Sequence, residues 1–213
     1  PWLANRSLRF NARMTSFRNV RFDFSGTYGK SVLAFVLLPL LGLFSLGLLQ
    51  PFATRYSGRY VAANYSYGET KLKSDPQLKR LFKGLFQAFF MILLPALVLL
   101  GIMTQHDWDL ERLILIPDDG ATGWFIDLSP FALIIAFYLA FFHYRAVARN
   151  SILGSLSISG IHQLESEISG FRLAWIVFSN TVLTLISLGL LQPWGVVRRW
   201  RYETQSLKLI PGG

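Results

Sequence analysis

The chain has 213 residues and a net charge of +9, and 52% of its residues are hydrophobic while only 15% are charged. Soluble domains carry about a quarter charged residues, so this composition argues against a soluble domain and indicates a membrane protein. The chain has no cysteine, which excludes disulfide bonds and thiolate metal sites.

Charge is sorted by segment along the chain. Residues 1–30 and 52–83 are strongly basic, whereas residues 103–128 are acidic. This alternation between apolar runs follows the positive-inside rule, while a nucleic-acid-binding surface would need a contiguous basic face on a soluble module. We therefore expect cytoplasmic basic segments, a periplasmic acidic loop at 103–128, and no nucleic-acid partner.

The first thirty residues contain a predicted strand and no signal peptide. They are arginine-rich and lack an apolar core followed by a cleavage site. The Pro-Trp pair at residues 1–2 matches a pattern found again later, so we expect the chain to begin just after an apolar helix of a longer protein. Residues 18–26 alternate apolar and polar side chains, which predicts a short strand that pairs with a similar segment.

Four apolar runs of about 15–20 residues follow, and the longer ones have the length of a helix that crosses the bilayer. Twenty residues without a charge rise about 30 Å as a helix, which matches the hydrocarbon core. The fold class predicted is therefore an all-α polytopic membrane protein with four apolar segments and short β-strands in the connectors. The runs are residues 31–50, 84–103, 128–142 and 173–192.

An internal duplication is visible in the sequence. Ser-Leu-Gly-Leu-Leu-Gln-Pro occurs at residues 45–51 and again at 187–193, and an Arg-Tyr pair follows eight positions after each proline. Repetition of this length indicates related structural units. We interpret residues 1–213 as one membrane domain that contains related units at about 18–75 and 145–209.

The same motifs resemble a known family. An apolar run ends in Gly-Leu-Leu-Gln-Pro-Trp, a segment like Arg-Arg-x-Arg-Tyr follows, and Asn-x-x-x-Gly then leads into a short strand. This pattern resembles the YjgN-like bacterial inner-membrane proteins, whose domain has no assigned function. The sequence departs from it at Phe52, which replaces the tryptophan, and before His143, where Gln-Pro is missing. The resemblance implies a multipass inner-membrane protein and supplies no catalytic residues. It rests on residues 18–26, 48–68, 145–154 and 190–202.

Motifs for catalysis or cofactor binding are absent from the sequence. It contains no phosphate-binding loop, no Gly-x-Ser-x-Gly and no His-Glu-x-x-His. His106, Asp107 and Asp109 could hold a cation in the acidic loop, although a solvated loop is the commoner outcome for such a cluster. We therefore predict no enzymatic activity, no cofactor and no metal site. The sequence carries no signal for the oligomeric state.

Two sets of residues are candidates for function. Uncharged polar or helix-weakening residues inside the first and fourth runs predict a break or a path: Pro39, Asn180, Thr181 and Thr184. Arginines beside aromatic residues just beyond the helix ends predict contacts with anionic headgroups or an anionic substrate: Arg55, Arg59, Arg198, Arg199 and Arg201.

These residues leave two functions and two topologies open. One function is transport or permeation of a small solute along a path between the related halves. The alternative is a non-transporting lipid-binding or scaffold protein whose basic-aromatic belts bind anionic phospholipids of the bilayer. Plain crossings by residues 31–50 and 173–192 would place basic segments in the periplasm. Re-entrant hairpins broken near Pro39 and Asn180 would keep those segments cytoplasmic.

Overall fold

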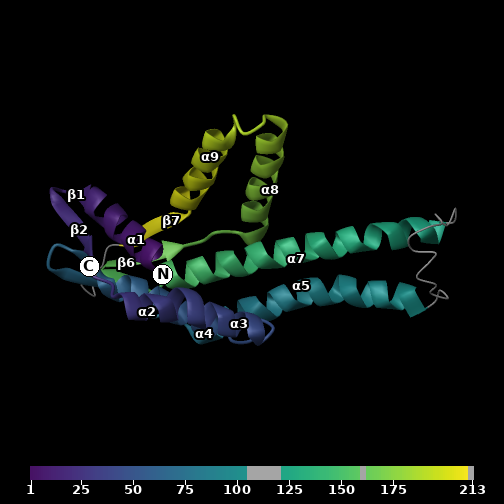
Figure 1. The fold of residues 1–213 in the computed structure, drawn as a ribbon, viewed down its shortest axis with the longest axis horizontal. Coiled ribbons are helices and arrows are strands. Elements are labelled where there is room, and N and C mark those ends of the chain that lie inside the picture. The colour runs from purple at the N-terminus through teal and green to yellow at the C-terminus, as the bar shows by residue number, and fades with distance from the viewer. Residues whose placement is uncertain (105–120, 159–161, 211–213) are drawn as a thin grey trace.

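A computed structural model gives the fold and describes residues 1–104, 121–158 and 162–210 (Figure 1). Two long helices, α5 (Leu78–Thr104) and α7 (Ala121–Leu153), lie side by side. Short strands gather at the end of this pair where α5 begins and α7 ends, and two shorter helical hairpins start from the same end. The architecture is therefore mostly helical with a small sheet, as the sequence predicts.

The α5–α7 pair contains two helices that are long and apolar enough to cross a membrane. The candidate spans are Leu78–Gly101 and Phe131–Leu153, with 24 and 23 residues. Twenty-three residues of helix rise about 35 Å, more than the hydrocarbon core of about 30 Å. Only 11% and 22% of their most apolar stretches are buried. A core helix of a soluble protein would be mostly buried, whereas these two stretches are mostly exposed.

The first and fourth apolar runs form helical hairpins instead of long helices. In each hairpin a 17-residue helical segment, about 25 Å long, reaches a turn, and a second helix returns beside it. We name residues 28–64 the first hairpin and residues 170–205 the second hairpin. The first consists of α2 (Tyr28–Val32), a π-helical turn η1 (Leu33–Leu37), α3 (Leu38–Phe44) and α4 (Gln50–Asn64). The second consists of α8 (Gly170–Ile186) and α9 (Gln192–Gln205).

The two hairpins take different directions from the long pair. The first lies along the beginning of α5, whereas the second leaves α7 at a steep angle (Figure 1). Its base is fixed on α7, because the Tyr138 hydroxyl donates to the Ala174 carbonyl at 3.0 Å. Beyond Phe178, whose ring lies 6.4 Å from that of Tyr138, no ring contact or side-chain hydrogen bond joins the described residues of α7 to α8.

The sheet is an antiparallel meander in which each strand pairs with the next along the chain. The predicted strand at 18–26 is confirmed as β2, and it pairs with β3 with Phe24 opposite Tyr65. Each of α1 (Trp2–Met14), α4, α7 and α9 runs almost directly into a strand. The strands are β1 (Ser16–Phe17), β2 (Val20–Phe24), β3 (Tyr65–Tyr67), β4 (Thr70–Ser74), β5 (Leu156–Ile158), β6 (His162–Ser166) and β7 (Leu207–Ile210).

Two small apolar cores lie at the bases of the hairpins. The first gathers Ala12, Phe24, Ala34 and Tyr60, from α1, β2, η1 and α4. The second gathers residues of α7, of α8 and of the segment before α8: Phe142, Ala146, Ile168, Leu173 and Ala174. The packing therefore fixes the hairpin bases against the sheet end of the molecule and leaves the outer turns exposed.

Candidate functional site

The repeated heptapeptide forms the same chain reversal in both hairpins. We name residues 45–50 and 187–192 the tip turns. In the first, the Gly47 N–H donates to the Gly42 carbonyl at 2.8 Å and the Leu46 N–H donates to the Leu43 carbonyl at 3.0 Å. These two bonds define a Schellman helix end. The second tip turn repeats them from Gly189 to Thr184 and from Leu188 to Leu185, at 2.8 and 3.1 Å.

A serine side chain completes each tip turn. The Ser45 hydroxyl oxygen accepts from the Leu49 N–H at 2.9 Å, and the Ser187 hydroxyl oxygen accepts from the Leu191 N–H at 3.0 Å. With the backbone bonds of the same segments, every backbone N–H across both tip turns has a partner within its own hairpin. The turns therefore need no water to satisfy these donors.

The leucine side chains of the tip turns are exposed. Leu46 is 96% exposed and Leu188 is 94% exposed. Isolated exposed leucines are ordinary on protein surfaces, but a contiguous apolar patch at the end of a hairpin marks an interaction site. Other strongly exposed apolar residues continue the patch on each hairpin: Leu43, Phe44 and Leu48 on the first, and Leu185, Ile186 and Leu190 on the second.

The structure corrects the predicted position of the breaks. Asn180 and Thr181 lie inside the uninterrupted helix α8, and neither hairpin reverses at the residues predicted from the sequence. Pro39 stands in the first turn of α3, just after the π-helical turn, so the helix changes its geometry there without reversing. The reversals come later, at the tip turns, because glycine in the left-handed region ends a helix more sharply than asparagine or proline inside it.

A polar network joins two predicted site residues across the second hairpin. The Arg198 Nη1 donates to the Ser179 hydroxyl at 2.8 Å and to the Asn180 Oδ1 at 3.2 Å. The Asn180 amide in turn donates to the Gly195 carbonyl at 2.8 Å. The guanidinium carbon of Arg198 lies 5.3 Å from the centre of the Trp194 ring, in the range of a cation–π contact. Arg198 is thus held by neutral groups.

The two threonines of the predicted path serve their own hairpin. The Thr181 hydroxyl donates to the Val177 carbonyl one turn back at 2.9 Å. The Thr184 carbonyl accepts both the Gly189 N–H and the Ser187 hydroxyl, so it helps to close the second tip turn. The Thr181 hydroxyl and the Thr184 carbonyl are thus used within the second hairpin.

The predicted contacts Arg55 and Arg59 share a carboxylate. Arg55 donates to Asp75 from Nε at 3.0 Å and from Nη2 at 2.9 Å, and Arg59 donates to the same carboxylate from Nε at 2.9 Å. The Arg55 hydrogen bond, supported by Arg59, lowers the pKa of Asp75 below its ordinary value of 3.8. The cluster lies where α4 passes the start of α5, so it ties the first hairpin to the sheet end.

Of the predicted arginines Arg199 and Arg201, the first has a carboxylate partner. The Arg199 Nε donates to the Glu203 carboxylate at 2.8 Å, and Arg149 of α7 lies 3.6 Å from the same carboxylate. Arg201 is exposed, and no ion pair or side-chain hydrogen bond of Arg201 is found within the described part of the chain. Among the five predicted arginines, Arg55, Arg59 and Arg199 therefore have carboxylate partners.

Tyrosines fasten the base of each hairpin, a role that the sequence analysis missed. The Tyr60 hydroxyl has two acceptors within hydrogen-bond distance, the Asn5 Oδ1 at 2.9 Å and the Thr27 carbonyl at 3.1 Å. In the second hairpin the Tyr202 hydroxyl accepts from the Ser169 N–H at 2.9 Å. Thr27 and Ser169 precede α2 and α8, so each tyrosine joins the two ends of its hairpin. The repeated Arg-Tyr spacing is the signal that could have found this pair.

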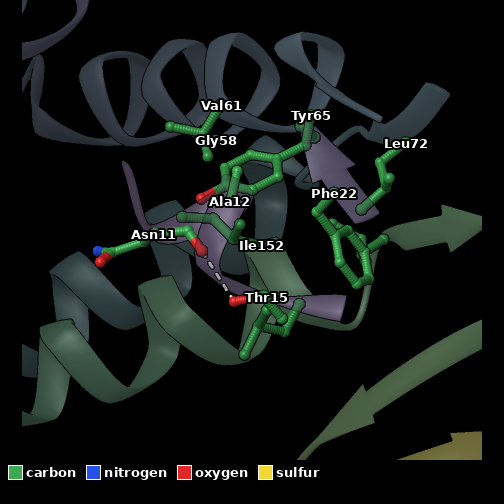
Figure 2. Close-up of a pocket in the computed structure, with 12 residues that line it drawn as sticks. Asn11, Ala12, Thr15, Phe22, Gly58, Val61, Tyr65, Leu72 and Ile152 are labelled. Carbon is green, nitrogen blue, oxygen red and sulfur yellow. Dashed lines mark hydrogen bonds between the residues drawn. The ribbon is translucent and has the colours of Figure 1, made fainter. Parts of the chain in front are cut away.

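An apolar pocket of about 370 Å³ lies on the sheet end of the molecule (Figure 2). Its walls come from α1, α4, the end of α7 and the strands, with Ala12, Gly58, Tyr65 and Ile152 among its lining residues. Gly58 allows the close approach, because a Cβ there would lie 2.9 Å from Ile152. The groups that line the pocket are mostly apolar, so it offers packing and little chemistry.

Metal chemistry finds no support in the described residues. Within residues 1–104, 121–158 and 162–210, no group of three His, Asp or Glu side chains could hold a metal ion. The cation site considered at His106, Asp107 and Asp109 lies outside the described residues.

Comparison with known proteins gives a family and no activity. No curated protein matches the chain, and no solved structure matches it. The profile of a bacterial family of unknown function, DUF898, matches residues 1–213. The resemblance to YjgN-like proteins noted in the motifs is consistent with this match. The chain therefore belongs to DUF898, a family of bacterial proteins of unknown function.

Proposed function

We propose that this protein is a multipass protein of the bacterial inner membrane that acts as a lipid-binding scaffold. In this proposal α5 and α7 cross the bilayer, and both hairpins enter the cytoplasmic leaflet without crossing it. The observation that carries the proposal is the depth of the first tip turn. A Cβ at Gly47 would lie 3.9 Å from Leu85, seven residues after the start of α5 at Leu78.

That depth is too small for a crossing. Seven residues of helix rise only about 10 Å, whereas the hydrocarbon core is about 30 Å thick. Whether α5 enters the bilayer at Leu78 or at residue 84, where its charge-free run begins, the first hairpin ends in the leaflet nearest the sheet. The second hairpin shares the 17-residue helical segment and the tip turn, and we assign it to the same leaflet.

The tip turns have the properties that lipid demands of an irregular segment. Irregular backbone in the hydrocarbon region is costly because lipid cannot satisfy its N–H and C=O groups. Both tip turns bond their backbone N–H groups internally and expose Leu46 and Leu188 instead. A water-exposed loop would need neither feature.

The charge distribution supports the cytoplasmic side. Residues 1–30 and 52–83 are basic and lie with the sheet and the hairpin bases, at the end where α5 begins. The acidic residues 103–128 connect the opposite ends of α5 and α7 in the sequence. The positive-inside rule then places the sheet in the cytoplasm and the acidic connection in the periplasm.

Transport between the related halves is the second candidate function. Its support is that both hairpins are broken helices, an arrangement common in transporters. The polar groups proposed for the path favour the scaffold, because Asn180 bonds Gly195 and Arg198, and Thr181 bonds its own helix. We therefore rank lipid binding above permeation.

The depth of the tips tests the proposal. A nitroxide attached to Leu46→Cys or Leu188→Cys in reconstituted protein should collide with oxygen more than with a polar nickel chelate, because oxygen concentrates in hydrocarbon. A label at Arg21→Cys, an exposed position on β2, is the water-exposed control. Tip labels as accessible to the chelate as the control would contradict the proposal. Solute flux through the same liposomes would favour transport.

A further inference from the structure

Among the predicted arginines, Arg198 is held by two neutral hydrogen-bond acceptors and an aromatic ring. Its acceptors, Ser179 and Asn180, are neutral, and no ion pair of Arg198 is found within the described residues. By contrast, Arg55 and Arg59 form ion pairs with Asp75, and Arg199 forms one with Glu203. We propose that Arg198, oriented by Ser179 and Asn180 and stacked on Trp194, binds the phosphate of an anionic phospholipid in the cytoplasmic leaflet.

The hydrogen-bonding capacity of Arg198 fits this ligand. A guanidinium carries five N–H donors in a planar fork, and the hydrogen bonds of Arg198 to Ser179 and Asn180 both leave from Nη1. The Nε–Nη2 edge therefore stays available for a bidentate contact, which is the geometry that arginine uses with phosphate. Ser179 and Asn180 fix the opposite corner of the fork, so the edge is oriented before the ligand arrives.

Trp194 stabilises the Arg198 guanidinium by a cation–π contact and favours a position at the membrane surface. Its ring is half exposed and lies under the guanidinium, and tryptophan is enriched at the level of lipid headgroups. The same pair recurs on α1, where the Arg6 guanidinium carbon lies 5.1 Å from the centre of the Trp2 ring. Each arginine stands four residues after its tryptophan, one helical turn along the same face.

The orientation of the second hairpin agrees with a headgroup contact. Arg198 lies six positions after Gln192, where α9 begins, and this length of helix rises about 9 Å. Because the hairpin leaves α7 at a steep angle (Figure 1), this length runs mostly along the membrane plane when α7 crosses the bilayer, so Arg198 and the second tip turn would lie at similar depth near the headgroups of one leaflet. This inference rests on the proposed insertion of the second hairpin.

The surroundings of Arg198 favour a lipid over a soluble anion. Val196, Val197 and Trp200 flank it on α9 and are 63%, 52% and 66% exposed. A soluble phosphate would leave these apolar groups in water, whereas a phospholipid covers them with its glycerol and acyl chains while its phosphate reaches the guanidinium. Charge complementarity selects anionic headgroups over zwitterionic ones.

Lipid titration of the purified full chain, followed by native mass spectrometry, tests the site. Phosphatidylglycerol should bind more tightly than phosphatidylcholine, and Arg198→Gln should weaken phosphatidylglycerol binding at least about tenfold, as for loss of a charge-assisted pair. Arg198→Lys should fall between the two because it keeps the charge and loses the fork. Arg21→Gln removes the same charge from an exposed position on β2, outside the second hairpin, and should change the affinity less than about twofold.

Ser179→Asp is the sharpest variant, because it places a carboxylate beside Arg198 and neutralises it without removing it. This variant should lose the preference for phosphatidylglycerol while its thermal unfolding stays close to that of the wild type. Unchanged preference in Ser179→Asp or Arg198→Gln would overturn the proposal, as would an equal loss in Arg21→Gln. Inorganic phosphate should not displace the lipid, and displacement at matched concentration would assign the site to a free anion instead. The tip-depth measurement reports insertion independently of headgroup binding, so the two proposals can fail separately.

Discussion

Leu46 and Leu188 have the same backbone conformation 142 positions apart, with φ angles of 53° and 51°, and both side chains are almost fully exposed. Leucine rarely adopts the left-handed region, which costs an ordinary residue roughly 1–2 kcal/mol. A water-exposed turn would be more stable with glycine or asparagine there. Retention of leucine in both copies is accounted for if the side chain lies in hydrocarbon, where burial of leucine contributes about 1.5–3 kcal/mol.

The glycine of each tip turn is expected to be essential for its geometry. Gly47 and Gly189 have φ angles of +90° and +92°, so Gly47→Ala and Gly189→Ala should each destabilise the protein by about 1–2 kcal/mol through backbone strain. Space is not the cause, since a Cβ at Gly189 would meet nothing within 4 Å. Gly29→Ala is the control, because Gly29 lies in α2 with open space around it. Unfolding in detergent measures all three, and equal stability of the variants would refute this role.

Loss of the tyrosine hydroxyl should destabilise the two hairpin bases by different amounts. Tyr60 is 5% exposed and its hydroxyl satisfies the buried Asn5, so Tyr60→Phe should cost about 1–2 kcal/mol by leaving that acceptor without its donor. Tyr202→Phe removes an exposed contact to Ser169, where water can replace the hydroxyl, and should cost about 0.5 kcal/mol. Thermal unfolding of the two variants compares them, and a larger loss for Tyr202→Phe would contradict the packing described for the bases.

The carboxylate of Asp75 should make stability depend on pH in the acid range. Because Arg55 and Arg59 lower its folded pKa below 3.8, its stabilising contribution is present above the unfolded pKa and is lost as pH falls through the folded pKa. Asp75→Asn removes this component, so its unfolding temperature should fall less than that of the wild type below about pH 4. At neutral pH the change should be small, since Asp75 is exposed and screened. Parallel acid profiles would show that the cluster does not contribute.

The sequence could predict the elements but not all of their breaks. The strand at 18–26 and the long second and third runs follow from periodicity and length, and β2, α5 and α7 agree with them. The sequence predicts breaks near Pro39 and Asn180 because proline and asparagine weaken helices in general. The chain instead reverses at Gly47 and its counterpart, inside the repeated heptapeptide. A leucine in the left-handed region just before that glycine contradicts local propensity, so propensity alone could not place the turn.

The candidate site depends on contacts that spacing does not show. Asp75 reaches Arg55 and Arg59 only because β3 and β4 fold back and bring the start of α5 beside α4. The contact between Arg198 and Asn180 exists because the tip turn returns α9 along α8. Two predicted residue sets, one assigned to a path and the other to headgroups, thus belong to one network. Only the position of the turn could have joined them.

The topology of the basic segments tests the central claim most directly. The chain has no cysteine, so single cysteines at Arg13, Asp118 and Gln205 can be probed with a membrane-impermeant thiol reagent in intact cells. If both hairpins enter and leave by the cytoplasmic face, only Asp118→Cys should be labelled, and all three should react after the membrane is permeabilised. Labelling of Arg13→Cys and Gln205→Cys in intact cells would mean that residues 31–50 and 173–192 cross the membrane, and it would contradict the account.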